Sequence, residues 1–226
     1  MWSLLAEISQ KLQASSTSIK AAVSSLLDYD IFWDGSTQHE FLETIDESVD
    51  QGSNLIMLMM LAFRSEADSL EMKPEPHALQ EILSTVVDTV ALGPHQLVTD
   101  FPPEGGPVFV DYGYLAVALR LLLEVLIEPE PPSAQIELLA VESKECWLLD
   151  IKAIPETIGT AIGHLGEDQF EELLTDGNLL SLSREKLLKL FTASRIFRLQ
   201  NIQLDVQTVE TGKVVLRLTI PAAVLS

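Results

Sequence analysis

The chain has 226 residues and only one cysteine, Cys146. A lone cysteine excludes an intrachain disulfide, so we expect a protein of the reducing cytoplasm. Long apolar runs are also missing, because the longest, Leu55–Phe63, is far shorter than the about 20 residues that cross a bilayer. No basic segment opens the chain, and Glu7 interrupts its first apolar residues, which is unlike a signal peptide. The sequence therefore predicts a cytoplasmic protein with no direct membrane insertion in this chain.

Basic residues are scarce as well. Lysine and arginine number 14 against 34 aspartate and glutamate residues, which gives a net charge of −20. Such a field repels phosphate, so nucleic acid and anionic membrane surfaces are not expected partners. The 4 histidines are scattered, without a cysteine cluster or a serine–histidine–carboxylate arrangement, so neither a metal site nor a nucleophilic triad is expected. A hydrophobic content of 47% with 21% charged residues nevertheless indicates a folded globular protein.

Apolar residues at alternating spacings of three and four predict two long helices at the start of the chain. The first covers residues 2–28, with the seam Leu5, Ile8, Leu12, Ser15, Ile19, Ala22 and Leu26. The second follows a short turn, with the seam Leu42, Ile45, Val49, Gly52, Ile56, Met59 and Phe63 and a further apolar edge at Leu55, Leu58 and Ala62. An antiparallel hairpin cannot bury these stripes fully. We expect a homodimer that forms a four-helix bundle; the alternative is packing of the hairpin onto the rest of the chain.

The prolines in Lys73–Pro76 end the helical pattern and predict a domain boundary, with a helical hairpin at 1–72 and a second domain at 73–226. The expected helices cover 79–90, 114–127 and 183–200, with a further short helix in the acidic stretch 166–176. The expected strands cover 96–100, 108–110, 135–141, 145–151, 202–208 and 213–220. The glycines of 159–166 are interpreted as a lid-like loop. This order predicts an α+β protein whose second domain is an α/β sandwich.

The first expected helix carries a recognisable pattern between Ile8 and Lys20. Its Ser9, Leu12, Thr17, Ser18 and Ile19 match the pattern Ser-His-Glu-Leu-Arg-Thr-Pro-Leu-Thr-Ser-Ile. The segment thereby resembles the phosphoacceptor helix of sensor histidine kinases. Gln10 stands where that family has its histidine, and a glutamine amide has no free lone pair on nitrogen to attack a phosphoryl group. Heptad counting places Gln10 at the most exposed position, where another domain could reach it but where any polar residue is also unremarkable.

The resemblance continues along nearly the whole chain. The segments concerned are Phe41–Ser48, Leu70–Pro76, Asp111 with Leu115, and Thr211–Pro221. They are similar to the second dimerisation helix and to the ATP-binding domain that histidine kinases share with gyrase and Hsp90. The resemblance implies a histidine-kinase/gyrase/Hsp90-type sandwich behind the hairpin.

The nucleotide motifs of that family are degenerate here. Its asparagine-rich helix, Asn-Leu-Leu-Glu-Asn-Ala, corresponds to Leu121–Leu126, which keeps Glu124 but has Val125 where the family has a Mg²⁺-binding asparagine. Its Asp-x-Gly-x-Gly motif corresponds to Asp150–Ile154, in which Asp150 is kept and both glycines are lost. Its glycine-rich phosphate loop has no counterpart near 179–183. Asp150 and Glu124 are therefore the candidate residues of a vestigial nucleotide site; for Asp150 the alternative is a carboxylate at a strand end in water.

We therefore expect a catalytically inactive histidine-kinase-like scaffold or regulator of two-component signalling, with no cofactor. The expected partner is a response regulator or another histidine kinase. By resemblance, its docking surface comprises Gln10, Gln13, Ala14, Thr17, Lys20, Asn54 and Met57. The alternatives are a divergent sensor histidine kinase or nucleotide sensor that still binds ATP or ADP with Mg²⁺, and a kinase-derived phosphotransfer protein. His39 is a conceivable phosphoacceptor, although an exposed surface histidine is the simpler interpretation.

Overall fold

The protein is described by a computed structural model that covers residues 2–29, 35–90, 97–102, 105–127, 136–143, 145–154, 156–165, 182–209 and 213–223. The chain divides into two compact units, Met1–Phe63 and Arg64–Ser226. This division falls in the last turns of the second helix, whereas the sequence placed a boundary at residues 72 and 73. None of the helices in the described ranges has the length and apolarity needed to span a membrane.

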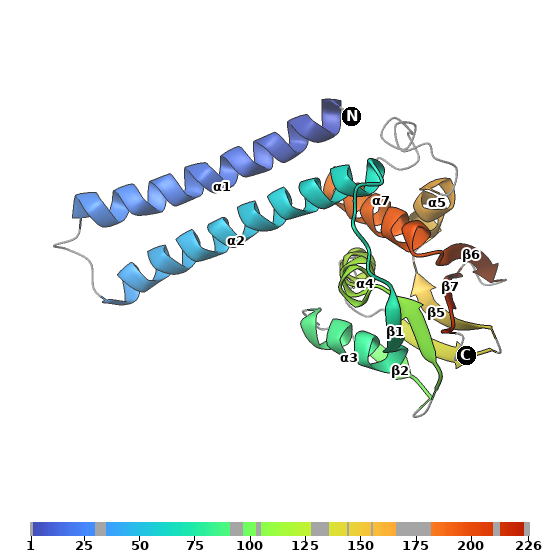
Figure 1. Ribbon diagram of the computed structural model, residues 1–226. Helices are drawn as coiled ribbons and strands as arrows, with labels where there is room; N and C mark the ends of the chain where they lie inside the picture. Colours follow the sequence, from blue (N-terminus) through green and yellow to red (C-terminus); the bar gives the residue numbers. More distant parts are fainter. Residues whose placement is uncertain are drawn as a thin grey trace. The chain divides into compact units, whose positions relative to one another are not determined.

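The first unit is the predicted antiparallel hairpin. Its helices are α1 (Trp2–Tyr29) and α2 (Gly35–Glu66), which lie side by side in Figure 1. On α1 the predicted seam is confirmed at Ile8 and Ala22, which are both buried. Gly52 of α2 lies close to α1, because a Cβ built on it would be 4.0 Å from both Leu12 and Ser15. The two helices therefore pack along the seam expected for α1.

Of the seam predicted for α2, Gly52 lies beside α1, whereas four of the larger members are exposed within the single hairpin. The buried residues of α2 in this unit are Ser48, Leu55, Leu58 and Ala62, three of which formed the additional apolar edge. Leu42, Val49, Ile56 and Phe63 of the predicted seam are instead between 45% and 55% exposed. We call these four residues, which are spaced seven apart, the exposed stripe. Apolar periodicity identified both sets of residues, but it could not decide which set faces α1.

The second unit is the predicted α/β sandwich. Its helices are α3 (Leu79–Thr89), α4 (Tyr112–Ile127), α5 (Glu156–Leu165) and α7 (Arg184–Leu199). Its strands are β1 (Glu75–Ala78), β2 (Leu97–Asp100), β3 (Pro107–Val110), β4 (Ile136–Glu142), β5 (Cys146–Ile154), β6 (Gln203–Val209) and β7 (Lys213–Pro221). Five strands form a mixed sheet in the order β2-β4-β5-β7-β6, in which β2 and β4 are parallel and the other pairs are antiparallel. The helices form a layer beside this sheet (Figure 1).

The core of this unit lies between the sheet and the helical layer. On β7 every second residue, Val214, Leu216, Leu218 and Ile220, is buried. On β5 the buried residues alternate in the same way and are Trp147, Leu149 and Ile151. Since successive side chains of a strand point to opposite faces, the residues between them lie on the outer face of the sheet, away from the core. Most of α4 is buried as well, which makes it the central helix of the layer.

Two elements differ from the sequence-based expectations. Glu75–Ala78 is strand β1, which pairs antiparallel with β3, although the prolines around it predicted only a break. A four-residue strand is too short for an alternation to be read, and proline is tolerated at a sheet edge. The expected lid-like loop at 159–166 is also wrong up to residue 165, because Glu156–Leu165 forms α5. Its Ile158, Ala161 and Ile162 are buried on one helical face, which outweighs the helix-weakening glycines. The predicted acidic helix at 166–176 lies outside the described residues.

Replacing each of the two glycines of α5 with alanine is expected to have opposite effects on the stability of the protein. A Cβ on Gly159 would lie 2.7 Å from Cγ1 of the buried Val214, whereas a Cβ on Gly163 meets nothing within 4 Å. Gly159→Ala should destabilise the protein by about 1–3 kcal/mol through overpacking. Gly163→Ala should stabilise it by about 0.5–1 kcal/mol, because alanine restricts the unfolded chain. Urea unfolding of the two variants tests this, and equal midpoints would contradict the close contact between α5 and β7.

Candidate functional site

The α1 surface that contains Gln10 is accessible. Gln10, Gln13, Ala14 and Thr17 are exposed at helical spacings that place them on one face, and Lys20 extends that face by one turn. The Thr17 hydroxyl donates a hydrogen bond of 2.7 Å to the carbonyl of Gln13 and so is satisfied within the helix. The exposed amide of Gln10 can donate and accept hydrogen bonds, but it cannot form the phosphoramidate that a histidine forms.

Asn54 and Met57 are exposed on α2. The antiparallel hairpin places Gly52 beside Leu12 and Ser15. Each residue further along α2 corresponds to one residue earlier on α1, since both helices rise about 1.5 Å per residue. Asn54 and Met57 therefore lie at about the same height along the hairpin as Gln10. The predicted docking residues of the two helices thus share one level of the hairpin.

The side chain at position 125 has no accessible surface. Val125 is 0% exposed and packs inside the α/β sandwich. Its neighbours Leu122 and Leu126 are buried too. A methyl-bearing side chain offers no oxygen to Mg²⁺, and its complete burial leaves no accessible surface at this position. The valine thus fills the core at this position.

Glu124 is engaged by two cations. Oε2 of Glu124 lies 2.9 Å from Nζ of Lys189 on α7, and Oε1 lies 3.5 Å from Nε of Arg120 one turn earlier on α4. Lys189 also approaches Glu185 at 3.5 Å and is only 14% exposed. The four residues form a network between α4 and α7 that neutralises Glu124 from within the protein. Glu124 thus acts in the packing of two helices, and its carboxylate is not free.

Asp150 lies in the middle of β5 and forms a bidentate ion pair with Arg217 on β7. The guanidinium Nε and one terminal nitrogen each donate a hydrogen bond of 2.7 Å to a different carboxylate oxygen. The two residues are directly paired across the strands, and Asp205 of β6 is the next residue in the same row. The hydrogen bond to Asp150 raises the pKa of Arg217 above its ordinary value, while burial acts in the opposite direction.

The alternation of β5 places this ion pair on the outer face of the sheet. Leu149 and Ile151, on either side of Asp150, are 0% exposed and point into the core. Glu124 belongs to the helical layer, so the structure does not bring Asp150 and Glu124 together. Nucleotide binding by these two residues stays a prediction, and the geometry of both argues against it. The interpretation of Asp150 as a strand-end carboxylate in water is wrong, because Asp150 is paired and lies within the strand.

The glycine positions after Asp150 are filled by side chains. Lys152 forms an ion pair of 3.6 Å with Glu137 across the β4–β5 ladder, and Ile154 is buried after a register shift in β5. At the start of α7 the Ser183 hydroxyl accepts a hydrogen bond of 3.2 Å from the backbone N–H of Lys186. This side chain caps the first turn of the helix. Residues 166–181, which precede it, are not described.

The remaining candidates do not form a catalytic centre. His39 is an exposed residue that lies 3.1 Å from Glu43 one turn later, as expected of a surface histidine. His77 makes an edge contact with the ring of Tyr112. Within the described ranges, no three His, Cys, Asp or Glu side chains gather where they could hold a metal ion.

The helical hairpin followed by a mixed five-stranded sheet with a layer of helices is the fold found in solved histidine kinases. The Acinetobacter baumannii histidine kinase AdeS matches with a TM-score of 0.61 and 15% identity over 93% of this chain and 96% of that chain. Full-length ShkA, solved in complex with AMPPNP, matches with a TM-score of 0.63 and 13% identity over 98% of this chain, which spans 46% of ShkA. The catalytic domain of the histidine kinase ThkA matches with a TM-score of 0.50 and 16% identity, covering 67% of this chain and 97% of that chain. No protein-family model and no curated protein matches the sequence. The resemblance inferred from the motifs is thus confirmed at the level of the fold.

Proposed function

We propose that this protein is a catalytically inactive histidine-kinase-like scaffold that acts in cytoplasmic two-component signalling. The observation that supports it most strongly is the complete burial of Val125. An active kinase of this fold needs a Mg²⁺ ligand at that position, and an apolar side chain in the core cannot supply one.

Three further observations support the same proposal. The phosphoacceptor position holds Gln10, which cannot carry a phosphoryl group. Glu124 is neutralised by Lys189, and Asp150 is held by Arg217 on the outer face of the sheet. Gln10, the Glu124–Val125 pair and Asp150 lie in three separate segments, and each of the three sites departs from a different requirement of phosphoryl transfer. Their combination favours a protein selected for binding partners rather than for catalysis.

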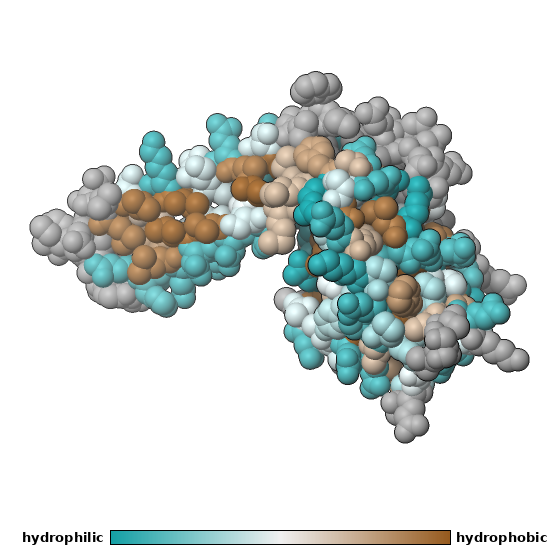
Figure 2. Space-filling view, in the orientation of Figure 1, coloured by the Kyte–Doolittle hydropathy of each residue, from teal (hydrophilic) through white to brown (hydrophobic). Residues whose placement is uncertain are grey.

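The proposed scaffold is a homodimer. The exposed stripe of α2 is adjacent to the buried residues of the same helix, since each residue advances the helix by about 100°. Four large apolar side chains in a continuous row are costly to leave in water. Figure 2 shows apolar side chains gathered along the hairpin. A second copy of the hairpin would cover the stripe and complete a four-helix bundle.

The proposed partner is a response regulator or a histidine kinase that docks on α1 around Gln10. Lys20 provides a positive charge on a chain whose net charge is −20, and so gives an acidic partner surface one favourable contact. The exposed amides of Gln10 and Gln13 provide hydrogen-bonding groups without a competing charge.

Calorimetric titration with ADP, ATP and AMPPNP, each with and without Mg²⁺, tests the proposal. We expect no binding at millimolar nucleotide, because the described candidate ligands Glu124 and Asp150 are already paired within the protein. ShkA, whose structure holds AMPPNP, is the positive control for the titration. Micromolar binding by this chain would overturn the scaffold function and would favour a divergent kinase or a nucleotide sensor.

A further inference from the structure

The sheet of the second unit ends in β6, an edge strand of seven residues (Figure 1). Within the described ranges, β6 pairs with β7 and with no other strand. In an antiparallel pair, every second residue of the edge strand directs its N–H and C=O away from the neighbouring strand. The outer edge of β6 therefore presents a row of backbone donors and acceptors to which a further strand can bind.

β6 has few of the features that keep edge strands from pairing with other chains. Native edge strands are commonly very short, interrupted by a bulge, or marked by lysine and proline. Gln203–Val209 contains neither of these residues, and its pairing with β7 runs over all seven residues without a register shift. The opposite edge of the sheet, β2, has only four residues and is soon followed by Pro102. Of the two edges, β6 is therefore the one that is long and regular enough to accept a strand.

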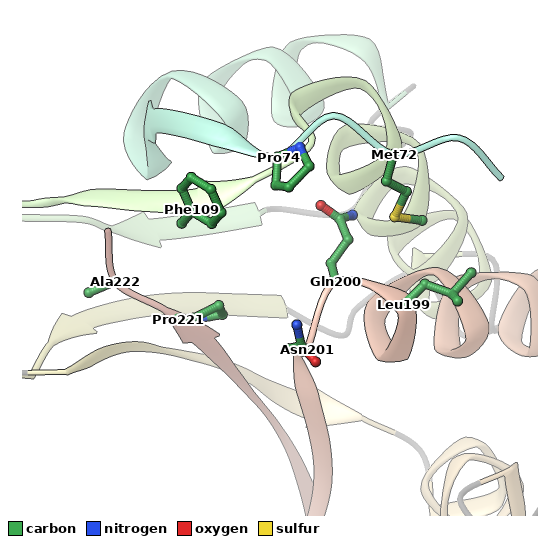
Figure 3. A pocket seen from close by; sticks show the side chains of 8 residues that line it. All are labelled: Met72, Pro74, Phe109, Leu199, Gln200, Asn201, Pro221 and Ala222. Carbon is green, nitrogen blue, oxygen red and sulfur yellow. The ribbon is translucent and has the colours of Figure 1, made fainter. Parts of the chain in front are cut away.

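The start of β6 is held in place by the end of α7. The N–H of Ile202 donates to the carbonyl of Phe197 at 2.9 Å, and Asn201 has a φ of 58°, so the helix ends in a Schellman motif with asparagine in the left-handed position. Figure 3, a view into the pocket at this end of α7, shows Asn201 where the helix passes into the strand. Oε1 of the preceding Gln200 accepts a hydrogen bond of 2.6 Å from the backbone N–H of Asp111. The edge strand is thus preorganised, which lowers the cost of binding.

A row of charged side chains on the outer face of the sheet ends at this edge. Asp150 on β5 is opposite Arg217 on β7, which in turn is opposite Asp205 on β6. The guanidinium donates its two hydrogen bonds of 2.7 Å to Asp150. Because Asp150 neutralises Arg217, the exposed Asp205 adds an uncompensated negative charge at the end of the row. The facing residue of a further strand would lie about 5 Å from Asp205, where a cation is attracted and an anion is repelled.

The other side chains of β6 describe the strand that fits beside it. Gln203 and Gln207 are exposed on the same face as Asp205, whereas Leu204 and Val206 point to the opposite face and are half-buried. A matching strand therefore alternates polar and apolar residues, with a cation at its centre. A second copy of β6 offers no cation, and the two copies would each carry a net charge of −20. A basic strand from a different protein is the better complement.

From the regular edge and its single charge we propose that β6 binds an extended segment of a partner protein as a sixth strand of the sheet, with a lysine or arginine of that segment opposite Asp205. The backbone of β6 supplies the hydrogen bonds, and Asp205 selects among the strands that could form them. This inference goes beyond the proposed scaffold function and does not depend on it, because β6 belongs neither to the hairpin nor to the nucleotide motifs.

Two peptides with blocked termini, Val-Thr-Val-Lys-Val-Thr-Val and Val-Thr-Val-Glu-Val-Thr-Val, test the proposal on the full chain. Their alternation places the central charge and the threonines on one face and the valines on the other. In calorimetric titrations the lysine peptide should bind at least about fivefold more tightly than the glutamate peptide. Amide hydrogen exchange followed by NMR should show that the lysine peptide protects every second residue of β6 and none of β2. Absence of binding by the lysine peptide, or binding without protection in β6, would overturn the proposal.

Variants of two aspartates separate pairing at β6 from general electrostatic attraction. Asp205→Lys should reverse the preference, because the glutamate peptide then supplies the opposite charge, and Asp205→Asn should remove the preference but leave the protection of β6. Asp100→Lys is the matched control, since Asp100 is also exposed and lies in the same row of the sheet, but on β2. Equal losses of affinity for the lysine peptide in Asp100→Lys and Asp205→Lys would indicate attraction by net charge alone and would contradict the assignment. A preference for lysine that persists in Asp205→Asn would contradict it as well.

Discussion

Replacing Val49 and Ile56 together with glutamate is expected to convert the proposed dimer into a monomer. Both residues lie in the middle of the exposed stripe on α2, where the proposed second copy packs. Because each copy contributes two, the dimer would bury four unpaired carboxylates in an apolar interface, which costs at least about 4 kcal/mol and so raises the dissociation constant at least about a thousandfold. The folded monomer should be little affected, because both side chains are about half exposed in it. Sedimentation equilibrium over a range of concentrations measures the change.

The control for this experiment adds the same charge to another face of α2. Asn54→Glu combined with Met57→Glu places two carboxylates at exposed positions that are rotated about 60° or more from the exposed stripe, at about 100° per residue. This variant should remain dimeric, and it should lose affinity for a partner that docks around Gln10. A dimer that survives in the Val49 and Ile56 variant would assign dimerisation to a different surface.

Placing asparagine at position 125, as in the histidine-kinase motif that this segment resembles, is expected to destabilise the protein rather than to restore nucleotide binding. Val125→Asn places an amide where the side chain is fully buried, without a partner for its donors. The lost apolar contacts and the unsatisfied amide should together lower the free energy of unfolding by about 2–4 kcal/mol. Chemical denaturation measures this loss, and Val125→Ala serves as the control for the packing contribution alone.

The same variant separates the scaffold from an active kinase. If the space around position 125 could admit Mg²⁺ and nucleotide, the asparagine would find a ligand, and ATP with Mg²⁺ would recover stability by mass action. We expect the denaturation midpoint of Val125→Asn to be the same with and without millimolar ATP and Mg²⁺. A midpoint that rises with ATP and Mg²⁺ would show that the variant binds nucleotide, and so that the space for nucleotide around position 125 is still present.

The sequence was sufficient for most of the architecture because periodicity reports burial directly. The strands β5 and β7 alternate, and α3, α4 and α7 carry apolar faces, so their existence and order followed from the pattern. The structure differed from the expectations where the local pattern allowed more than one arrangement. On α2 both the exposed stripe and the buried face have helical spacing, and only the three-dimensional packing distinguishes them. β1 is defined by its partner β3 rather than by its own four residues.

The candidate site was harder to predict because motif matching ignores the direction of side chains. Asp150 matched a nucleotide-binding aspartate in type, but the buried Leu149 and Ile151 on either side turn it to the outer face. The apolar period of Trp147, Leu149 and Ile151 contained that information, although Leu148 obscured it. Its pairing with Arg217 depends on the register between β5 and β7, for which the sequence has no local signal. The hydrogen bond from the backbone N–H of Asp111 to Oε1 of Gln200 likewise joins residues that are 89 positions apart.

The spacing of the exposed stripe also fixes a handedness. Leu42, Val49, Ile56 and Phe63 repeat every seven residues, which falls about 20° short of two full turns of a straight α-helix. Over the three intervals the row drifts by about 60° around α2. Two copies that keep the whole row in contact must therefore wind around each other as a left-handed supercoil. Deleting one residue between Val49 and Ile56 would rotate one half of the row by about 100° against the other and would leave only half of it able to pair.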